Sequence, residues 1–248
     1  MKLLLLSLGL LIGASQGRVL LQGFWWDFWN DNFLNQWAEL SPRLASLGID
    51  AVWIPPTIKN SGQWVGYAPF DHYDLGDKYQ KGFTATRIGT KDELLRMVAA
   101  MHANGIDVIQ DVVLNHVTGA GTSSGAGGSD PAGWGDNYKN FRYVSFASPV
   151  TNDDAQDYLS RSGRFPKNWQ NFHNNPGHDC TTGDICSAYW GPDACYYPDA
   201  YGQSSNAAFN PPQSTEYMRN NMRACMVWYK KQMGFDAFRL DAVKHFLA

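Results

Sequence analysis

The chain carries three copies of one short pattern, in which an amphipathic helix is followed by glycine and then by an apolar strand. The copies lie at Leu47-Gly48-Ile49-Asp50, Asn104-Gly105-Ile106-Asp107 and Met233-Gly234-Phe235-Asp236. Glycine is suited to the end of a helix because it adopts the left-handed conformation there without steric strain. Each copy is therefore a helix-to-strand junction, and strands that alternate with helices favour a parallel sheet.

Three helices and four strands are predicted from the spacing of apolar residues. The first helix has leucine and tryptophan at three- and four-residue intervals between Leu34 and Leu47. The second begins at Thr90 with Glu93 three residues later, which is the pattern of a capping box. The third helix follows Pro211-Pro212. The expected strands are residues 19–25, 49–54, 106–114 and 235–240.

The strands are nearly continuous apolar runs, which indicates a parallel sheet covered on both faces. Doubly wound sheets and barrels both fit this pattern. The positions of the polar and aromatic side chains separate the two, because they follow the carboxyl ends of the strands, where every characterised (β/α)8 barrel builds its site. These side chains are Trp25-Trp26-Asp27, Tyr67, His116, and the pair Arg239 and Asp241.

The last strand ends in a combination of residues that suits nucleophilic catalysis. Side chains alternate along a strand, so Arg239 and Asp241 project from the same face. A permanently charged guanidinium keeps a neighbouring carboxylate ionised and oriented, as a nucleophilic aspartate requires. An isolated Arg-x-Asp is more often a structural ion pair, and a lone His116 after a strand is more often a structural residue. The occurrence of both segments, residues 111–116 and 234–245, in one chain is a far more specific signal of a catalytic site than either segment alone.

Residues 111–116 (Asp-Val-Val-Leu-Asn-His) and 234–245 (Gly-Phe-Asp-Ala-Phe-Arg-Leu-Asp-Ala-Val-Lys-His) resemble the first two signature regions of the α-amylase family, glycoside hydrolase family 13. Residues 64–76 and 80–82 resemble the loop after the second barrel strand of liquefying α-amylases. The likeness covers residues 19–116 and 206–248 well, and the segment between them poorly. It implies the N-terminal half of a (β/α)8 TIM barrel, with a small β-rich domain inserted after the third strand.

The resemblance also implies roles for single residues. Asp241 would be the nucleophile, and Arg239 would position it. Asp111 is expected to be an inward structural carboxylate without a catalytic role. Three further groups would bind substrate: His116 to a sugar hydroxyl, Tyr67 to the ring by stacking, and Lys244 with His245 to the leaving-group side. The general acid, a glutamate after the fifth strand, and a His-Asp pair after the seventh are expected beyond Ala248. The chain is therefore expected to be the N-terminal part of a longer enzyme.

Calcium is the cofactor that the resemblance implies, bound by oxygen ligands between the barrel and the inserted domain. Asn115 would supply a side-chain ligand and His245 a main-chain carbonyl. The aspartate that usually precedes the third helix is missing, because residues 206–210 read Asn-Ala-Ala-Phe-Asn. Several aspartates of the insertion could replace it, and the spacing does not choose among Asp179, Asp184, Asp193 and Asp199.

The expected segments are a secretory leader at residues 1–17, barrel strands one to three at 18–116, the inserted domain at 117–205, and the third helix with the fourth strand at 206–248. The leader begins with a lysine, continues with a leucine-rich run and ends in Ala-Ser-Gln-Gly, a cleavage-site pattern. Its apolar run is about ten residues, too short to span a bilayer. Residues 117–205 lack a sustained helical period, and so long a segment without structure would be unusual in a compact domain.

Export to an oxidising compartment would permit disulfides among Cys180, Cys186, Cys195 and Cys225. Three connectivities are open, and Cys225 could instead be a buried helix residue. The net charge of −3 and the absence of a basic cluster exclude a nucleic-acid or anionic-membrane partner. Aromatic residues make up 14% of the chain, and they suit either sugar stacking or core packing.

The sequence therefore predicts a secreted, monomeric α-amylase that hydrolyses internal α-1,4-glucosidic bonds of starch or glycogen with retention. Two alternatives remain open. One is a non-catalytic secreted remnant that binds carbohydrate. The other is a different α-glucan hydrolase or a transglucosidase of the same family, which would use the same residues.

Overall fold

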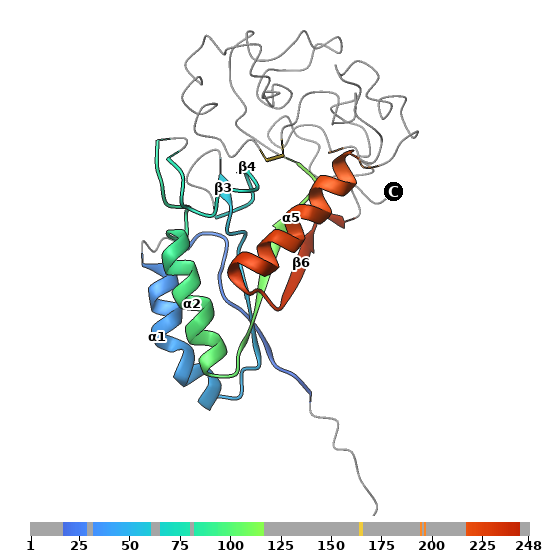
Figure 1. The fold of residues 1–248 in the computed structure, drawn as a ribbon. Coiled ribbons are helices and arrows are strands. Elements are labelled where there is room, and N and C mark those ends of the chain that lie inside the picture. The colour runs from blue at the N-terminus through green and yellow to red at the C-terminus, as the bar shows by residue number, and fades with distance from the viewer. Residues whose placement is uncertain are drawn as a thin grey trace, which may run out of the picture.

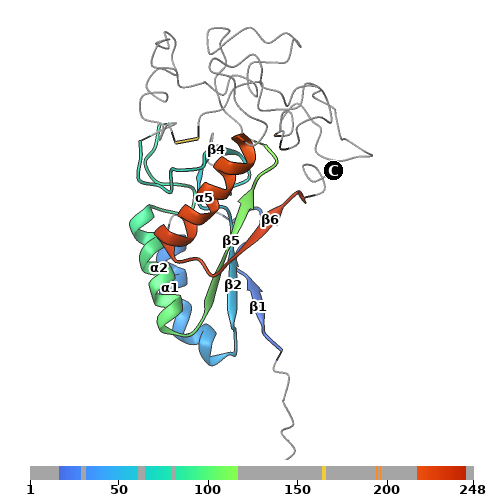
Figure 2. The ribbon, with the colours of Figure 1, turned by 45° about the vertical axis from the view of Figure 1, so that its right-hand side comes forward.

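The computed structural model describes residues 17–28, 32–60, 65–79, 82–116 and 217–243, together with Arg164, Phe165, Ala194 and Tyr196. Figure 1 shows the arrangement of these segments, whose main feature is a parallel sheet. Its strand order is β1-β2-β5-β6 (Figure 2). This confirms the predicted parallel α/β fold. The sheet strands are β1 (Leu20–Gln22), β2 (Ala51–Ile54), β5 (Asp107–Val113) and β6 (Ala237–Asp241). The helices are α1 (Phe33–Ser46), α2 (Lys91–Ala103) and α5 (Tyr217–Met233).

The spatial order of the four sheet strands is the same as their order in the chain. A doubly wound sheet reverses its strand order at one point, and the described strands show no reversal. Helix α1 packs against α2, which also contacts α5, and the three helices lie on one side of the sheet (Figure 2). This is the arrangement of successive βα units in a (β/α)8 barrel.

The two faces of the sheet differ in composition. The helix-covered face carries Val52, Ile54, Val108 and Val112, all of them fully or almost fully buried. The opposite face, which lines the interior in a barrel, carries Trp53, Asp111, Arg239 and Asp241 at the carboxyl ends of the strands. The alternation of side chains along the strands therefore places Asp111, Arg239 and Asp241 on one face, whereas the buried Gln110 lies on the other.

Strand β1 is shorter than predicted. It ends at Gln22, so the prediction that the strand extends through residues 23–25 was wrong. The main-chain N–H of Gly23 still donates to the carbonyl of Trp53 at 2.7 Å, and the chain then turns. The turn is closed by a hydrogen bond from the Phe28 N–H to the Trp25 carbonyl at 3.3 Å. It directs the aromatic residues that follow β1 away from the sheet ladder.

The helix ends follow the sequence signals closely. Gly48, Gly105 and Gly234 have φ angles of 79°, 73° and 78°, the left-handed conformation expected after each helix. Helix α1 also tolerates Pro42 in its interior. A proline cannot donate to the carbonyl four residues earlier, and here the Ser41 hydroxyl donates to that Ala38 carbonyl at 2.7 Å. The local hydroxyl thus replaces the missing backbone hydrogen bond.

The predicted capping box of α2 is present. The Thr90 side chain accepts from the Glu93 N–H at 3.3 Å, and the Glu93 carboxylate accepts from the Thr90 N–H at 2.8 Å. The bond from the Thr90 backbone is the main cause that lowers the pKa of Glu93 below its usual 4.5. We expect Thr90→Ala to reduce the free energy of unfolding by about 1 kcal/mol, as measured by urea titration.

The pH dependence of this cap follows from the lowered pKa of Glu93. The unfolded state binds the proton at higher pH than the folded state, so the contribution of Glu93 is present above about pH 4.5. It is lost as the pH falls through the folded pKa. Urea titrations of Glu93→Gln and the unsubstituted protein should therefore differ at pH 7 and converge in acid. A difference that persists unchanged at low pH would contradict this assignment.

A layer of loops lies beyond the carboxyl ends of the strands, around the short antiparallel pair β3 (Lys59–Asn60) and β4 (Pro69–Asp71) (Figure 1). The fully buried Lys59 side chain anchors this layer. Its ammonium nitrogen, which carries three N–H donors, lies 2.5–3.4 Å from the carbonyl oxygens of Lys78, Phe83, Thr84 and Ala85. It also lies 3.5 Å from the Asp74 carboxylate. Burial lowers the pKa of Lys59, and the Asp74 charge opposes that shift.

Helix α5 holds the same loop layer from the other side. Tyr229 donates from its hydroxyl to the His72 carbonyl at 2.6 Å, and the Cys225 thiol donates to the same oxygen at 3.8 Å. Cys225 is thus a buried helix residue, as one of the two alternatives proposed. The other three cysteines lie outside the described residues.

Most of the expected inserted domain, residues 117–205, lies outside the described residues, and so does the expected leader apart from Gly17. Within the described part of the chain, no helix combines the length and the apolar character needed to cross a bilayer.

Candidate active site

Four segments bring their side chains together where the parallel strands end. We call the set Trp53, Tyr67, Asp111, Arg239 and Asp241 the Asp111 cluster. Trp53 comes from β2, Tyr67 from the loop before β4, Asp111 from β5, and the other two from β6. The sheet register aligns Asp111 with Arg239 and Val113 with Asp241. The pairing of β5 with β6 therefore decides which carboxylate meets which arginine.

Asp111 is the most enclosed member, with no exposed surface, and three donors surround its carboxylate. Tyr67 donates its hydroxyl to Oδ2 at 2.5 Å, and the indole N–H of Trp53 donates to the same oxygen at 3.1 Å. Arg239 Nη1 lies 3.1 Å from both carboxylate oxygens. Burial raises the pKa of Asp111, whereas the Tyr67 hydrogen bond and the Arg239 charge act against that shift. The donors favour the ionised carboxylate, since each bond requires an acceptor.

Arg239 connects the buried carboxylate to a partly exposed one. Its Nη1 donates to Asp111 and also to Oδ1 of Asp241, and its guanidinium lies 5.0 Å from the centre of the Trp53 ring. Burial acts to lower the pKa of Arg239, but the two carboxylates outweigh it and raise the pKa above its usual value. The guanidinium is thus held by two carboxylates and a ring face. Its fixed position determines where Asp241 lies.

The backbone is strained directly after Asp241. Ala242 has a φ of 49°, in the left-handed region that residues with a side chain rarely adopt. Among the described residues it is the one non-glycine residue with a positive φ. Such strain persists only where the surrounding contacts enforce it, and it gathers at functional sites. At this position it turns the chain away from β6 just after the Asp241 side chain has been presented.

Tyr67 is linked to the site by its side chain and by its main chain. Its hydroxyl donates to Asp111, and its carbonyl lies 2.9 Å from Nε2 of His116. Burial and the Asp111 charge raise the pKa of Tyr67, so the hydroxyl keeps its proton as a donor. The ring of Tyr67 stacks on Trp26, with centroids 5.0 Å apart and an interplanar angle of 26°. Trp26 is 52% exposed and offers an aromatic surface at the edge of the site.

Asn115 and His116 lie at the end of β5, and both are buried. The Asn115 amide nitrogen lies 3.5 Å from Nδ1 of His116. Two residues from the expected insertion contact this strand end. Ala194 donates its N–H to the Asn115 carbonyl at 2.7 Å, and Tyr196 donates its hydroxyl to the Leu114 carbonyl at 2.9 Å.

Of the six expected site residues other than Asn115, the structure places four near one another: Tyr67, His116, Arg239 and Asp241. Lys244 and His245 lie outside the described residues. Neither Trp26 nor Trp53 was predicted individually as a site residue. Trp26 could have been predicted, because it follows the first strand as the other site residues follow theirs. Trp53 could also have been predicted, because strand alternation places it on the same face as Asp111.

The hydroxyl of Tyr67 can be tested by Tyr67→Phe. This change removes one of three donors to a buried carboxylate, so we expect the free energy of unfolding to fall by about 1.5–3 kcal/mol. Tyr79→Phe serves as the control, because Tyr79 is 62% exposed, and it should change stability by less than about 0.5 kcal/mol. Equal effects in urea titrations of the two variants would show that Asp111 does not depend on the Tyr67 hydroxyl.

Carboxylate and arginine side chains thus gather beside aromatic rings at the carboxyl ends of the parallel strands, where (β/α)8 barrel enzymes build their sites. Residues 41–247 match the family described as "Alpha amylase, catalytic domain". The chain belongs to this family.

Individual relatives agree with that assignment. The α-amylase of Bacillus licheniformis is 31% identical over 94% of this chain and 46% of its own length. The cytoplasmic α-amylase of Escherichia coli strain K12 is 42% identical over 41% of this chain and 21% of its own. The crystal structure of α-amylase I from Eisenia fetida shares the fold, with a TM-score of 0.51 and 17% identity over 92% of this chain and 38% of that one. The chain thus spans less than half the length of these relatives.

Proposed function

We propose that the protein is an α-amylase that hydrolyses internal α-1,4-glucosidic bonds of starch or glycogen with retention. The observation that carries the proposal is the presentation of Asp241 at the end of β6 by Arg239, which Asp111 holds from the buried side. A carboxylate oriented by a fixed guanidinium suits a nucleophile, because its oxygen is held in place for attack.

In the proposed reaction, the Asp241 carboxylate attacks the anomeric carbon of the sugar, and the glycosidic C–O bond breaks. The leaving oxygen takes a proton from the general acid, for which we propose a glutamate after a fifth barrel strand. Water then attacks the anomeric carbon from the face opposite Asp241, the bond between the sugar and Asp241 breaks, and the deprotonated glutamate takes a proton from the water. Two inversions give net retention. Arg239 holds the nucleophile in line throughout, and Asp111 holds Arg239.

Substrate contacts in the proposal come from the aromatic edge and the strand ends. The exposed side of Trp26 provides a flat surface for the C–H face of a sugar, and Tyr67 stacks behind it. We propose that Tyr67 and His116 line the position of the sugar that is attacked. Lys244 and His245 are proposed to contact the leaving-group side.

We propose calcium as a structural cofactor at the junction between β5 and the inserted domain. Asn115 fits such a site, because its amide supplies a hard oxygen donor and Ala194 contacts its main chain at 2.7 Å. The described residues contain no group of three His, Cys, Asp or Glu side chains that could hold a metal, so the other ligands are proposed among His245 and the aspartates of residues 117–205. The ion would fix the inserted domain to the strand end.

Removal of calcium is expected to destabilise the full-length protein. A ligand that binds only the folded state stabilises it by about 2.7 kcal/mol at a hundredfold excess over its dissociation constant. Treatment with EDTA should therefore lower the melting temperature, and added calcium should restore it, whereas magnesium at the same concentration should not. An unchanged melting curve, with no metal found by elemental analysis, would rule the site out.

The stereochemistry of the product tests the reaction. Full-length protein is added to a maltooligosaccharide, and proton NMR records the first anomer released. Release of the α-anomer is expected, and initial release of the β-anomer would exclude retention. Chain-length analysis of the same products separates hydrolysis from transglucosylation, because a transglucosidase makes products longer than the substrate. Binding without any product would indicate the non-catalytic alternative.

We further propose that residues 1–17 direct secretion and that the full-length protein is monomeric. The leader pattern in the sequence supports the first of these. Cell fractionation and the mass in solution test the two statements separately.

A further inference from the structure

The residues directly before β1 are attached to the sheet by the side chain of Asp50. The N–H of Val19 donates to Asp50 Oδ2 at 2.6 Å. In return, the N–H groups of Asp50 and Ala51 donate to the Val19 carbonyl at 3.0 and 3.2 Å. These bonds lie directly before β1, whose pairing with β2 starts at Leu20 and Ala51. The Asp50 side chain therefore fixes the point at which the edge strand begins.

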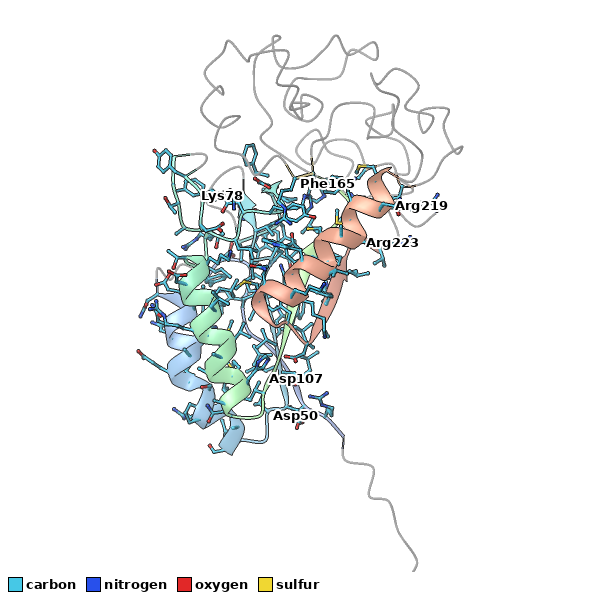
Figure 3. All side chains as sticks on the ribbon, viewed as in Figure 1. Asp50, Lys78, Asp107, Phe165, Arg219 and Arg223 are labelled. Carbon is cyan, nitrogen blue, oxygen red and sulfur yellow. The ribbon has the colours of Figure 1, made fainter. Side chains whose placement is uncertain are left out.

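Arg18 is held at the same end of the sheet by a different carboxylate. Its Nη2 lies 2.6 Å from Asp107 Oδ2 and 3.3 Å from the Asp50 carbonyl oxygen. Figure 3 shows Asp50 and Asp107 side by side at this end, far from the loop layer that carries Lys78 and Phe165. The hydrogen bond and charge of Asp107 raise the pKa of Arg18. The guanidinium thus pairs with the Asp107 carboxylate, whereas the Asp50 carboxylate accepts from the main-chain N–H of Val19.

The residue before Arg18 suits proteolytic processing. Gly17 is exposed, and within the described part of the chain no atom except its chain neighbours would lie within 4 Å of a Cβ at this position. Residues 14–17 read Ala-Ser-Gln-Gly, which puts small residues at the first and third positions before the bond to Arg18. A leader peptidase requires this pattern after an apolar run. This exposed bond therefore lies directly before the two residues, Arg18 and Val19, that are hydrogen-bonded to Asp107 and Asp50.

We propose that the bond between Gly17 and Arg18 is hydrolysed by a leader peptidase and that the new α-ammonium group of Arg18 docks against the Asp50 carboxylate. Water is the co-reactant: the Gly17 carbonyl carbon gains oxygen and becomes a carboxylate, and the Arg18 nitrogen becomes an ammonium group. The proposal is independent of the reaction that the protein catalyses.

The geometry brings the new charge close to Asp50 without moving the fold. Adjacent main-chain nitrogens are at most about 3.6 Å apart, so the Arg18 nitrogen lies within roughly 6 Å of Asp50 Oδ2. The other charged groups at this end are Asp107, paired with Arg18, and Asp236, which accepts from His102 and from the Val108 N–H. These carboxylates favour the charged form of the new amino group over its neutral form.

The first test identifies the N-terminus. The complete gene is expressed in a secreting bacterial host, and the exported protein is examined by N-terminal sequencing and intact mass. We expect Arg18 as the first residue. Gly17→Leu, which places a bulky residue before the bond, should block cleavage, while Gln16→Ala should be processed normally. A mature protein that begins at another residue, or that retains Met1, would overturn the proposal.

The second test measures the docking. The α-amino group of the processed protein is dimethylated with ¹³C-formaldehyde, and its pKa is followed by NMR. We expect a pKa above the usual ~7.7–8.0, and a value lower by about half a unit or more in Asp50→Asn. Asp50→Glu should keep most of the upward shift if Asp50→Asn folds poorly. Asp92→Asn, a change on α2 far from this end, should leave the pKa unaltered. An α-amino pKa that does not respond to Asp50 would refute the docking.

Discussion

Replacement of Asp241 by asparagine in the full-length protein is expected to lower kcat on starch by about 10⁴-fold or more while starch binding is retained. The amide has nearly the shape of the carboxylate and still meets Arg239, but it cannot form the glycosyl-enzyme. Arg239→Lys should also be severe, because lysine cannot donate to Asp111 and Asp241 from one planar group. Steady-state kinetics with a separate binding measurement distinguishes lost chemistry from lost binding.

The control for this experiment is Asp236→Asn. Asp236 directly precedes β6, at the opposite end from Asp241, and it accepts hydrogen bonds from His102 and from the Val108 N–H. This variant should lose stability but keep its kcat, because nothing at that end of the sheet reaches the site. If Asp241→Asn lost activity only a few-fold, or if the control lost activity equally, the nucleophile would have to be another residue.

Replacement of Lys59 by methionine is expected to destabilise the protein by about 3–5 kcal/mol, the cost of breaking a buried ion pair by removing one partner. The ammonium group shares its three N–H donors among four carbonyls and the Asp74 carboxylate, which has no exposed side-chain surface. Methionine fills much of the same volume but donates no hydrogen bond. These acceptors would then be buried without the donor that now serves them, and the free energy of unfolding from urea titration should fall accordingly.

Lys91→Met is the matched control. Lys91 also pairs with an aspartate, at 3.2 Å from Asp77, but both side chains are partly exposed. Such a pair contributes about 0.2–1 kcal/mol, so the control should cost no more than that. Asp74→Asn tests the other partner and should give an intermediate loss, because Lys59 would keep its carbonyl contacts. If Lys59→Met and Lys91→Met had equal effects, Lys59 would not be the anchor of the loop layer.

The sequence predicted the features that depend on neighbouring residues. The glycine after each helix needs only its own left-handed conformation, and the capping box spans only Thr90 to Glu93. The alternation in β6 predicted that Arg239 and Asp241 share a face, and their hydrogen bond follows from it. The end of β1 was predicted too late because the apolar run continues through Trp26, where the chain already turns.

Features that depend on sheet register and loop contacts could not be read from the sequence. Asp111 was expected to point inward, and it does, but its three donors come from Trp53, Tyr67 and Arg239, which are distant in the chain. The pairing of β2, β5 and β6 brings Trp53 and Arg239 to Asp111, and the loop before β4 brings Tyr67. Lys59 is a harder case. A single lysine before a loop suggests an exposed side chain, and its burial depends on carbonyls of residues 78–85 that surround it only in the folded protein.

The pairing of β5 with β6 has a consequence for synthesis. About 120 residues separate the two strands, and at ~5–20 residues per second a ribosome needs roughly 6–25 s to make them. Throughout that interval β5 can pair with β2 but presents its other edge unpaired, as a template for another chain. Substitutions that weaken the contact between β2 and β5 should therefore reduce the yield of soluble protein more than they reduce its melting temperature. Slower translation of residues 117–236 should lower that yield further.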